Sequence, residues 1–321
     1  MTEEHSSPGS VSRRKMLGST GALLAAGAAT VDAVAAPLAT NKRFSGRVAL
    51  VTGAARGMGR THAVALAREG AHVVLCDIAE QIPTIAYPLA TPADLEETVR
   101  QVKAAGGRCV AFKGDIRDPA TAQEMVTRAM AEFGRVDILL ANAGIYGSGQ
   151  PVAQMSDQAF DDLVRTNLHG VFYSMRAAIP AMAKNQFGRI VVTSSQAGRM
   201  GFGGSGHYCA TKWGVIGLVK SVAQEVAKSG ITVNAICPGS VATGITINPA
   251  SIRAAYPDQP DMSVDEYKRR QRAKGGGMMG VPWLEPEEVT AVILYLLSDE
   301  AKYMTGEVVG HTLGGLAGNS A

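Results

Sequence analysis

From Arg47 onward, short runs of consecutive apolar residues alternate with segments whose apolar residues recur at helical spacing. A strand that is apolar at every position is buried on both faces, which is typical of a parallel sheet with helices on both sides. Because crossovers between parallel strands are right-handed, the alternation predicts an α/β fold with a doubly wound parallel sheet. Such a sheet has one ligand crevice, at the carboxyl ends of its strands. The expected strands are residues 48–51, 72–76, 108–113, 136–141, 189–194 and 231–236, and the expected helices are 61–69, 95–105, 121–133, 158–184 and 207–228.

The composition excludes several classes of protein. The 321 residues are 46% apolar, which is enough for a full core and excludes a disordered chain. The net charge of +3 comes without a basic cluster, so we expect no nucleic-acid binding. The four cysteines are widely spaced and form no CxxC pair, so neither a disulfide framework nor a metal site is expected.

Residues 1–36 have the composition of an export signal. The pair Arg13-Arg14 precedes a short apolar run rich in alanine and glycine, and small residues follow up to Ala36. The paired arginines resemble the twin-arginine type of leader, which carries folded proteins. We therefore expect export to the periplasm or cell envelope, with cleavage near Ala35 or Ala36; a disordered leader on a cytoplasmic protein is the alternative. The apolar run is shorter than the roughly 18–20 residues that cross a bilayer, so no permanent membrane span is expected.

The first expected strand ends in a glycine-rich turn, TGAARGMG at residues 52–59. Glycines let the backbone approach a pyrophosphate closely, and the N-terminus of the next helix offers free N–H groups to the anion. Asp77 ends the second strand, where a carboxylate accepts hydrogen bonds from both ribose hydroxyls and repels a 2′-phosphate. Arg56 favours NADP instead, because its guanidinium could bind that 2′-phosphate. We give Asp77 more weight and predict NAD. The turn residues expected at the cofactor are Gly53, Arg56, Gly57, Met58 and Gly59.

Tyr208 and Lys212 lie four residues apart, on one face of an expected helix. A free tyrosine has a pKa near 10, and an ammonium one turn away favours the phenolate, which makes the phenol a usable acid or base. Ser195 ends the preceding strand at the same sheet edge, where its hydroxyl could bind a carbonyl or alkoxide oxygen. A solvated Tyr-Lys pair is common on surface helices, but next to this strand end and the glycine-rich turn we expect a catalytic set.

Together these motifs resemble those of the short-chain dehydrogenase/reductase family. Further motifs in the resemblance are ANAG at 141–144, Asn167 in RTNLHG, YCATK at 208–212 and the pair Pro238-Gly239. The resemblance covers about residues 44–315 and implies a single Rossmann domain over residues 44–321, with a seven-stranded parallel sheet between two helical layers. It also implies a homotetramer built on two long helices.

The resemblance implies a role for each motif residue. The implied catalytic tetrad is Asn167, Ser195, Tyr208 and Lys212. Ser195 would orient the reacting oxygen and Tyr208 would move the proton. Lys212 would lower the pKa of Tyr208 and hold the nicotinamide ribose, while Asn167 would hold a water that relays protons. The remaining implied cofactor contacts are Ile78, Asp115, Ile116, Asn142, Ala143, Gly144, Pro238, Gly239, Val241 and Thr243.

Residues 78–92 form an insert that is longer than the connection the fold needs. The insert is similar to that of the carveol-dehydrogenase-like subgroup, whose members are coupled to the redox cofactor mycofactocin. The resemblance implies that the insert covers the cofactor, that the bound NAD does not exchange readily, and that electrons leave through mycofactocin. The alternative is a plain surface loop, although the isoleucine, proline, tyrosine and leucine content is apolar for a solvated one.

Residues 244–284 form a long, methionine-containing segment that we expect to act as a substrate lid. The predicted substrate is a small apolar secondary alcohol or its ketone, of terpenoid or alicyclic type. Two alternatives remain open: an NADPH-linked reductase of the 3-oxoacyl type, and a non-catalytic NAD-binding redox sensor. Residues that could face the substrate cavity are Tyr146, Ser148, Met200, His207, Met262, Met278 and Met279, with ordinary core packing as the alternative for the methionines.

Overall fold

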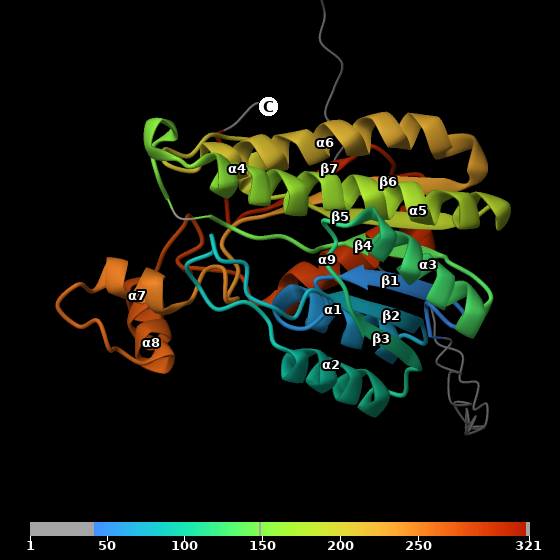
Figure 1. Ribbon diagram of the computed structural model, residues 1–321, viewed down its shortest axis with the longest axis horizontal. Helices are drawn as coiled ribbons and strands as arrows, with labels where there is room; N and C mark the ends of the chain where they lie inside the picture. The colour runs from blue at the N-terminus through green and yellow to red at the C-terminus, as the bar shows by residue number, and fades with distance from the viewer. Residues whose placement is uncertain (1–41, 148, 319–321) are drawn as a thin grey trace, which may run out of the picture. The chain divides into compact units, whose positions relative to one another are not determined.

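The computed structural model describes residues 42–147 and 149–318, and in them seven parallel strands form one sheet (Figure 1). The strands are β1 (Val48–Thr52), β2 (His72–Asp77), β3 (Cys109–Lys113), β4 (Ile138–Ala141), β5 (Gly188–Thr193), β6 (Ile231–Pro238) and β7 (Val308–His311). Their order is β3-β2-β1-β4-β5-β6-β7, so the winding reverses between β1 and β4, where a doubly wound sheet opens its crevice. The predicted fold class is therefore confirmed. The expected leader at residues 1–36 lies outside the described residues.

Two helical layers cover the sheet, as strands that are apolar on both faces require. The layer on one face contains α1 (Gly57–Arg68), α2 (Pro92–Ala104) and α9 (Pro286–Leu297), and the other contains α3 (Pro119–Phe133), α5 (Gly170–Lys184) and α6 (Gly206–Val226). Leu66 and Val73 belong to the core of the first interface, and Leu139 and Met175 to the core of the second. Among the described residues, no helix combines the length and apolar character needed to cross a membrane.

The helix predicted over residues 158–184 is divided into three parts. α4 (Asp157–Leu163) is followed by one π-helical turn, Val164–His169, and then by α5. The Ser156 hydroxyl caps the start of α4 by accepting a hydrogen bond from the Ala159 N–H at 3.2 Å. A π-helical turn inside a helix is rare and is often found at functional sites. This turn carries Asn167, one of the predicted catalytic residues.

The segment expected as a lid, residues 244–284, folds into α7 (Pro249–Ala255) and α8 (Val264–Lys274), which lie outside the three layers (Figure 1). Its own small core includes Tyr267 stacked on Trp283, with the ring centroids 6.3 Å apart. Met262 packs against this core. Met278 and Met279 are 75% and 71% exposed, so these two methionines do not line a cavity as we expected.

Candidate active site

The glycine-rich turn between β1 and α1 has the geometry of an anion cradle. Gly53 and Gly57 have φ values of +64° and +55°, in the left-handed region that glycine adopts without strain. A Cβ atom at Gly59 would overlap the carbonyl oxygen of Gly53, so only glycine allows the turn to close this tightly. In the part of the chain that the structure describes, no side chain caps the N-terminus of α1. Its first N–H groups remain available to an anion such as a pyrophosphate.

Asp77 ties this turn to the end of β2. One carboxylate oxygen accepts a hydrogen bond from the Ala55 N–H at 2.9 Å, and the other accepts one from the Ala79 N–H at 3.0 Å. The side chain is only 8% exposed, and burial raises the pKa of Asp77 against the lowering by these two hydrogen bonds. Each carboxylate oxygen has a second lone pair, and Asp77 lines the cavity, so it can also accept bonds from a ribose.

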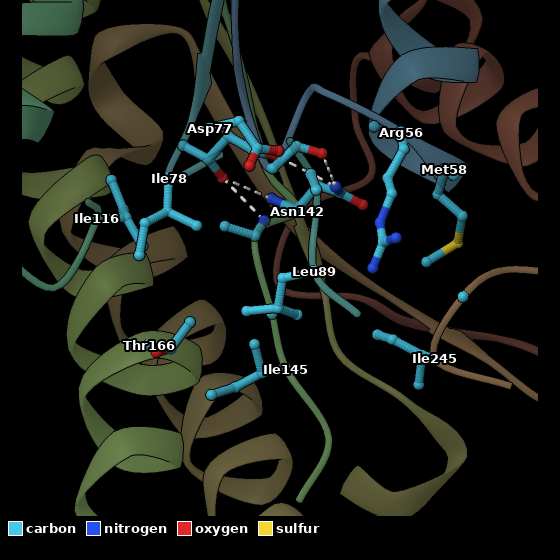
Figure 2. A pocket seen from close by; sticks show the side chains of 18 of the residues that line it. Arg56, Met58, Asp77, Ile78, Leu89, Ile116, Asn142, Ile145, Thr166 and Ile245 are labelled. Carbon is cyan, nitrogen blue, oxygen red and sulfur yellow. Dashed lines mark hydrogen bonds between the residues drawn. The ribbon is translucent and has the colours of Figure 1, made fainter. Parts of the chain in front are cut away.

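A cavity opens at the carboxyl ends of the strands, beside the turn and Asp77 (Figure 2). The predicted cofactor residues that line it are Gly53, Arg56, Gly57, Met58, Gly59, Asp77, Ile78, Asp115, Ile116, Asn142, Ala143, Gly144 and Thr243. Asn142 binds the end of β1, since its side-chain amide donates to the Thr52 carbonyl at 3.1 Å. Three other predicted cofactor residues, Pro238, Gly239 and Val241, are absent from this lining. Val241 is instead buried in a bridge with Leu284.

The cavity has further lining residues that the sequence did not indicate individually. The insert contributes Ile82, Tyr87, Leu89 and Ala90, and other segments contribute Ile145, Thr166 and Ile245. Figure 2 shows Leu89, Ile145 and Ile245 around the same space as Arg56. Ile82 and Tyr87 are buried, so the insert is a packed element and not a solvated loop. Its apolar composition was the one signal of this role in the sequence.

The insert is held by hydrogen bonds at three places. The Gln81 amide donates to the Ile85 carbonyl at 2.8 Å and accepts from the Leu89 N–H at 3.0 Å, which closes the insert on itself. At one end, the Arg56 guanidinium donates to the Pro88 carbonyl and joins the insert to the phosphate turn. At the other end, the Thr84 hydroxyl donates to the Asp162 carboxylate on α4 at 2.7 Å. The Asp162 carboxylate also accepts from Arg117 at 2.8 Å.

The predicted catalytic residues come together behind Gly144, which lines the cavity. A Cβ at Gly144 would lie 3.4 Å from Asn167 Oδ1 and 3.5 Å from Lys212 Nζ. The Lys212 ammonium donates to the Thr193 carbonyl at the end of β5 at 2.7 Å, and its nitrogen is 5.5 Å from the Tyr208 ring centroid. The four elements β4, β5, α6 and the π-helical turn therefore bring these groups to one place.

Asn167 is fully buried and its side-chain amide is bonded to the main chain of Ile145. Its Oδ1 accepts from the Ile145 N–H at 2.8 Å, and its Nδ2 donates to the Ile145 carbonyl at 2.9 Å. The same Nδ2 donates to the Thr211 hydroxyl at 3.3 Å. These bonds use both amide hydrogens and one lone pair of the amide oxygen, so the Asn167 side chain is fixed in place.

Burial dominates the ionisation of Tyr208 and Lys212 in the chain alone. Desolvation raises the pKa of Tyr208 above its ordinary value, against a lowering by its hydrogen bond with Ser195. Desolvation lowers the pKa of Lys212 to about 8. We expected Lys212 to lower the pKa of Tyr208, but in the chain alone burial raises it. Ser195 also accepts a hydrogen bond from the Ala197 N–H at 3.1 Å, so its side chain is oriented by the turn after β5.

Two of the residues expected on the substrate side, Tyr146 and His207, lie close to Tyr208. The Tyr146 ring meets the Tyr208 ring edge to face, with the centroids 5.0 Å apart. His207 is buried, and its imidazole packs so closely on Gly147 that a Cβ there would overlap it. Met200 is partly exposed. Ser148 lies outside the described residues.

Several known proteins resemble this chain. A family model described as short chain dehydrogenase matches residues 47–251, which include every predicted catalytic and cofactor-binding residue. The (−)-trans-carveol dehydrogenase of Rhodococcus erythropolis is 36% identical over 268 residues, or 83% of this chain and 96% of the relative. Carveol dehydrogenase from Mycobacterium avium, solved in complex with NAD, has a TM-score of 0.81 at 36% identity and covers 86% of this chain and 99% of its own. A short chain dehydrogenase from Mycobacterium paratuberculosis bound to NAD has a TM-score of 0.74 at 34% identity, covering 84% and 98%.

Proposed function

The chain belongs to the short-chain dehydrogenase family, and on that premise we propose that it is an NAD-dependent oxidoreductase that interconverts a hydrophobic secondary alcohol and its ketone. Alcohol-dehydrogenase chemistry with NAD follows from the family and from its NAD-bound solved relatives. The terpenoid or alicyclic nature of the substrate is the finer part of the proposal. It is supported by the similarity to carveol dehydrogenases and by the apolar cavity residues Leu89, Ile145 and Ile245.

The proposal rests mainly on one observation: at Gly144 the cavity comes close to the catalytic residues. Gly144 lines the cavity, and a Cβ atom on this glycine would lie 3.4 Å from Asn167 Oδ1 and 3.5 Å from Lys212 Nζ. A dinucleotide laid along the cavity has its phosphates at the turn of residues 52–59 and its adenosine ribose at Asp77. Its other end then reaches the catalytic residues beyond Gly144.

The residues present fit NAD. The uncapped N-terminus of α1 offers N–H groups to the pyrophosphate, and the lone pairs of Asp77 can accept from the ribose hydroxyls. NAD, when bound, supplies the nicotinamide that accepts a hydride from the alcohol carbon. The carboxylate of Asp77 disfavours a 2′-phosphate, and the Arg56 guanidinium that could bind one is instead bonded to the Pro88 carbonyl.

The chain's own residues handle the proton of the alcohol. As the C–H electron pair leaves as hydride, the O–H proton passes to the Tyr208 phenolate oxygen, and the carbon–oxygen bond becomes a ketone carbonyl. The Ser195 hydroxyl donates a hydrogen bond to the reacting oxygen. Lys212, when protonated, favours the phenolate through its charge.

Tyr208→Phe tests the mechanism, because it keeps the ring and removes the proton acceptor. We expect the rate of NAD reduction by carveol to fall roughly 100- to 10,000-fold, the usual contribution of a general base, while the amount of bound NAD stays the same. Tyr303→Phe, which makes the same change at an exposed tyrosine, is the matched control. Retained activity in Tyr208→Phe would show that another group takes the proton.

We also propose that NAD remains bound between turnovers and is reoxidised through mycofactocin. Support comes from the buried insert residues Ile82 and Tyr87 that line the cavity, and from the similarity to carveol dehydrogenases. The purified protein, once denatured, should release close to one NAD per chain. An empty protein that turns over added NADPH with 3-oxoacyl thioesters would favour a reductase. An NAD-loaded protein that oxidises no alcohol would favour a redox sensor.

A trapped cofactor suits the expected leader. A protein that leaves the cytoplasm already folded can carry its NAD with it, which removes the need for a soluble NAD pool outside. We therefore propose export through the twin-arginine route, supported by Arg13 and Arg14. Sequencing the N-terminus of the protein from the cell envelope should show a start after Ala35 or Ala36. A start at Met1 would contradict the proposal.

A further inference from the structure

The insert, residues 78–92, reaches past the cofactor cavity to the proton-transfer site through Tyr87. The Tyr87 side chain lines the cavity and is only 6% exposed. Its phenol oxygen accepts a hydrogen bond from the main-chain N–H of Tyr146 at 3.0 Å. The insert is therefore bonded directly to the segment that follows β4, two residues after Gly144.

Tyr146 is held at its main chain, at its hydroxyl and at its ring. The Tyr146 N–H donates to the Tyr87 hydroxyl, and the Tyr146 hydroxyl lies 2.7 Å from the Ser205 Oγ. Its ring meets Tyr208 at 77° with the centroids 5.0 Å apart, an edge-to-face geometry that aromatic pairs favour. Ser205 immediately precedes α6, the helix that carries Tyr208. The position of Tyr146 is therefore set by the insert on one side and by α6 on the other.

Apolar packing supports the same arrangement. Ile82, Ile85 and Tyr87 of the insert form one buried cluster with Ile145 and Leu163. Tyr146 and Tyr208 both pack against this cluster. The two rings beside the reacting centre thus rest on side chains of the insert.

We propose that Tyr87 is a positioning residue for the alcohol. By holding the main chain of Tyr146, it fixes the aromatic wall beside Tyr208 against which the carbon skeleton of the substrate packs. This inference rests on the proposed function and gives the insert a second role besides covering the cofactor. The ligand class that such a wall selects is a secondary alcohol with an apolar, cyclic skeleton, because a ring offers area to aromatic side chains and a small open-chain alcohol does not.

Tyr87→Phe tests this role, since it keeps the ring and its packing but removes the oxygen that accepts from Tyr146. Reduction of the bound NAD is followed in single turnovers with carveol and with 2-propanol, and the NAD content of each preparation is measured. We expect the second-order rate constant for carveol to fall roughly tenfold, the effect of leaving one partly buried N–H unpaired, with a clearly smaller fall for 2-propanol. The NAD content of Tyr87→Phe should match that of the wild type. The control Tyr303→Phe should leave the rate constant unchanged with both alcohols.

A double-mutant cycle with Tyr146→Ala shows whether Tyr87 acts through Tyr146. In the Tyr146→Ala background the ring to be positioned is gone, so Tyr87→Phe should cause no further loss with carveol. The same fold loss in both backgrounds, or equal losses with the two alcohols, would overturn the inference. The inference would also be overturned if the wild type oxidised carveol and Tyr87→Phe did so at the same rate. A wild type inactive with both alcohols would instead overturn the proposed function.

Discussion

The side-chain amine of Lys212 is buried, and only 3% of the residue is exposed. Burial lowers the pKa of Lys212 from 10.5 to about 8. Between these pH values the unfolded chain binds a proton that the folded chain lacks, so the free energy of unfolding rises with pH. From pH 8 to 10 we expect the wild type to gain roughly 1–3 kcal/mol of stability relative to Lys212→Met. Urea unfolding at a series of pH values measures this difference, and a difference that stays constant across the series would contradict the burial of the charge.

Single residues of the site differ in how far the sequence could identify them. Asp77 was predicted because it ends an apolar strand, and Gly144 was predicted because the ANAG motif resembles that of the family. Tyr87 and Thr166 were not, because they reach the cavity only through packing between segments far apart in the sequence. The direction of the Tyr208 pKa shift could not be predicted either, since it depends on how deeply the phenol is desolvated.

The insert depends on Gln81 for its shape, because one amide bonds main-chain groups at Ile85 and Leu89. Gln81→Ala removes these bonds and leaves the insert free to open. We expect NAD to dissociate roughly tenfold faster, the effect of losing one or two hydrogen bonds, with little change in the Tm of the bulk fold. Release is measured as NAD lost during dialysis or after dilution. Gln123→Ala, at an exposed position on α3, is the matched control, and equal release from both variants would show that Gln81 does not hold the insert closed.

Six of the seven strands and the helices α1, α2, α3 and α6 were predicted within a few residues, because each has a clear apolar period and an evident start or end. No residue range was predicted for β7 or α9. The π-helical turn Val164–His169 was not predicted, since its residues continue the helical spacing on both sides. α7 and α8 were also missed, because they pack on their own small core and not on the sheet. Their caps, Asn248 and Ser263, were the signals available in the sequence.

The outer faces of α5 and α6 carry large apolar side chains that the single chain leaves exposed. Phe172 on α5 is 40% exposed and Trp213 on α6 is 47% exposed. We propose that these two helices form an interface of the homotetramer, as in the family that the sequence resembles. Phe172→Glu places a charge in such an interface, so we expect light scattering to show smaller species than the wild type. Tyr303→Glu, another exposed aromatic position, should leave the mass unchanged; an unchanged mass for Phe172→Glu would exclude this interface.

The strand order affects how the newly synthesised chain folds. The pairing of β1 with β4 places Ala49 opposite Ile138, and no strand within residues 42–147 and 149–318 pairs with a partner through a tight hairpin. A topology with such distant pairings has a high contact order, so the chain folds slowly and exposes unpaired strand edges while it folds. On the export route that we propose, cytoplasmic chaperones would have to protect the chain until it has folded.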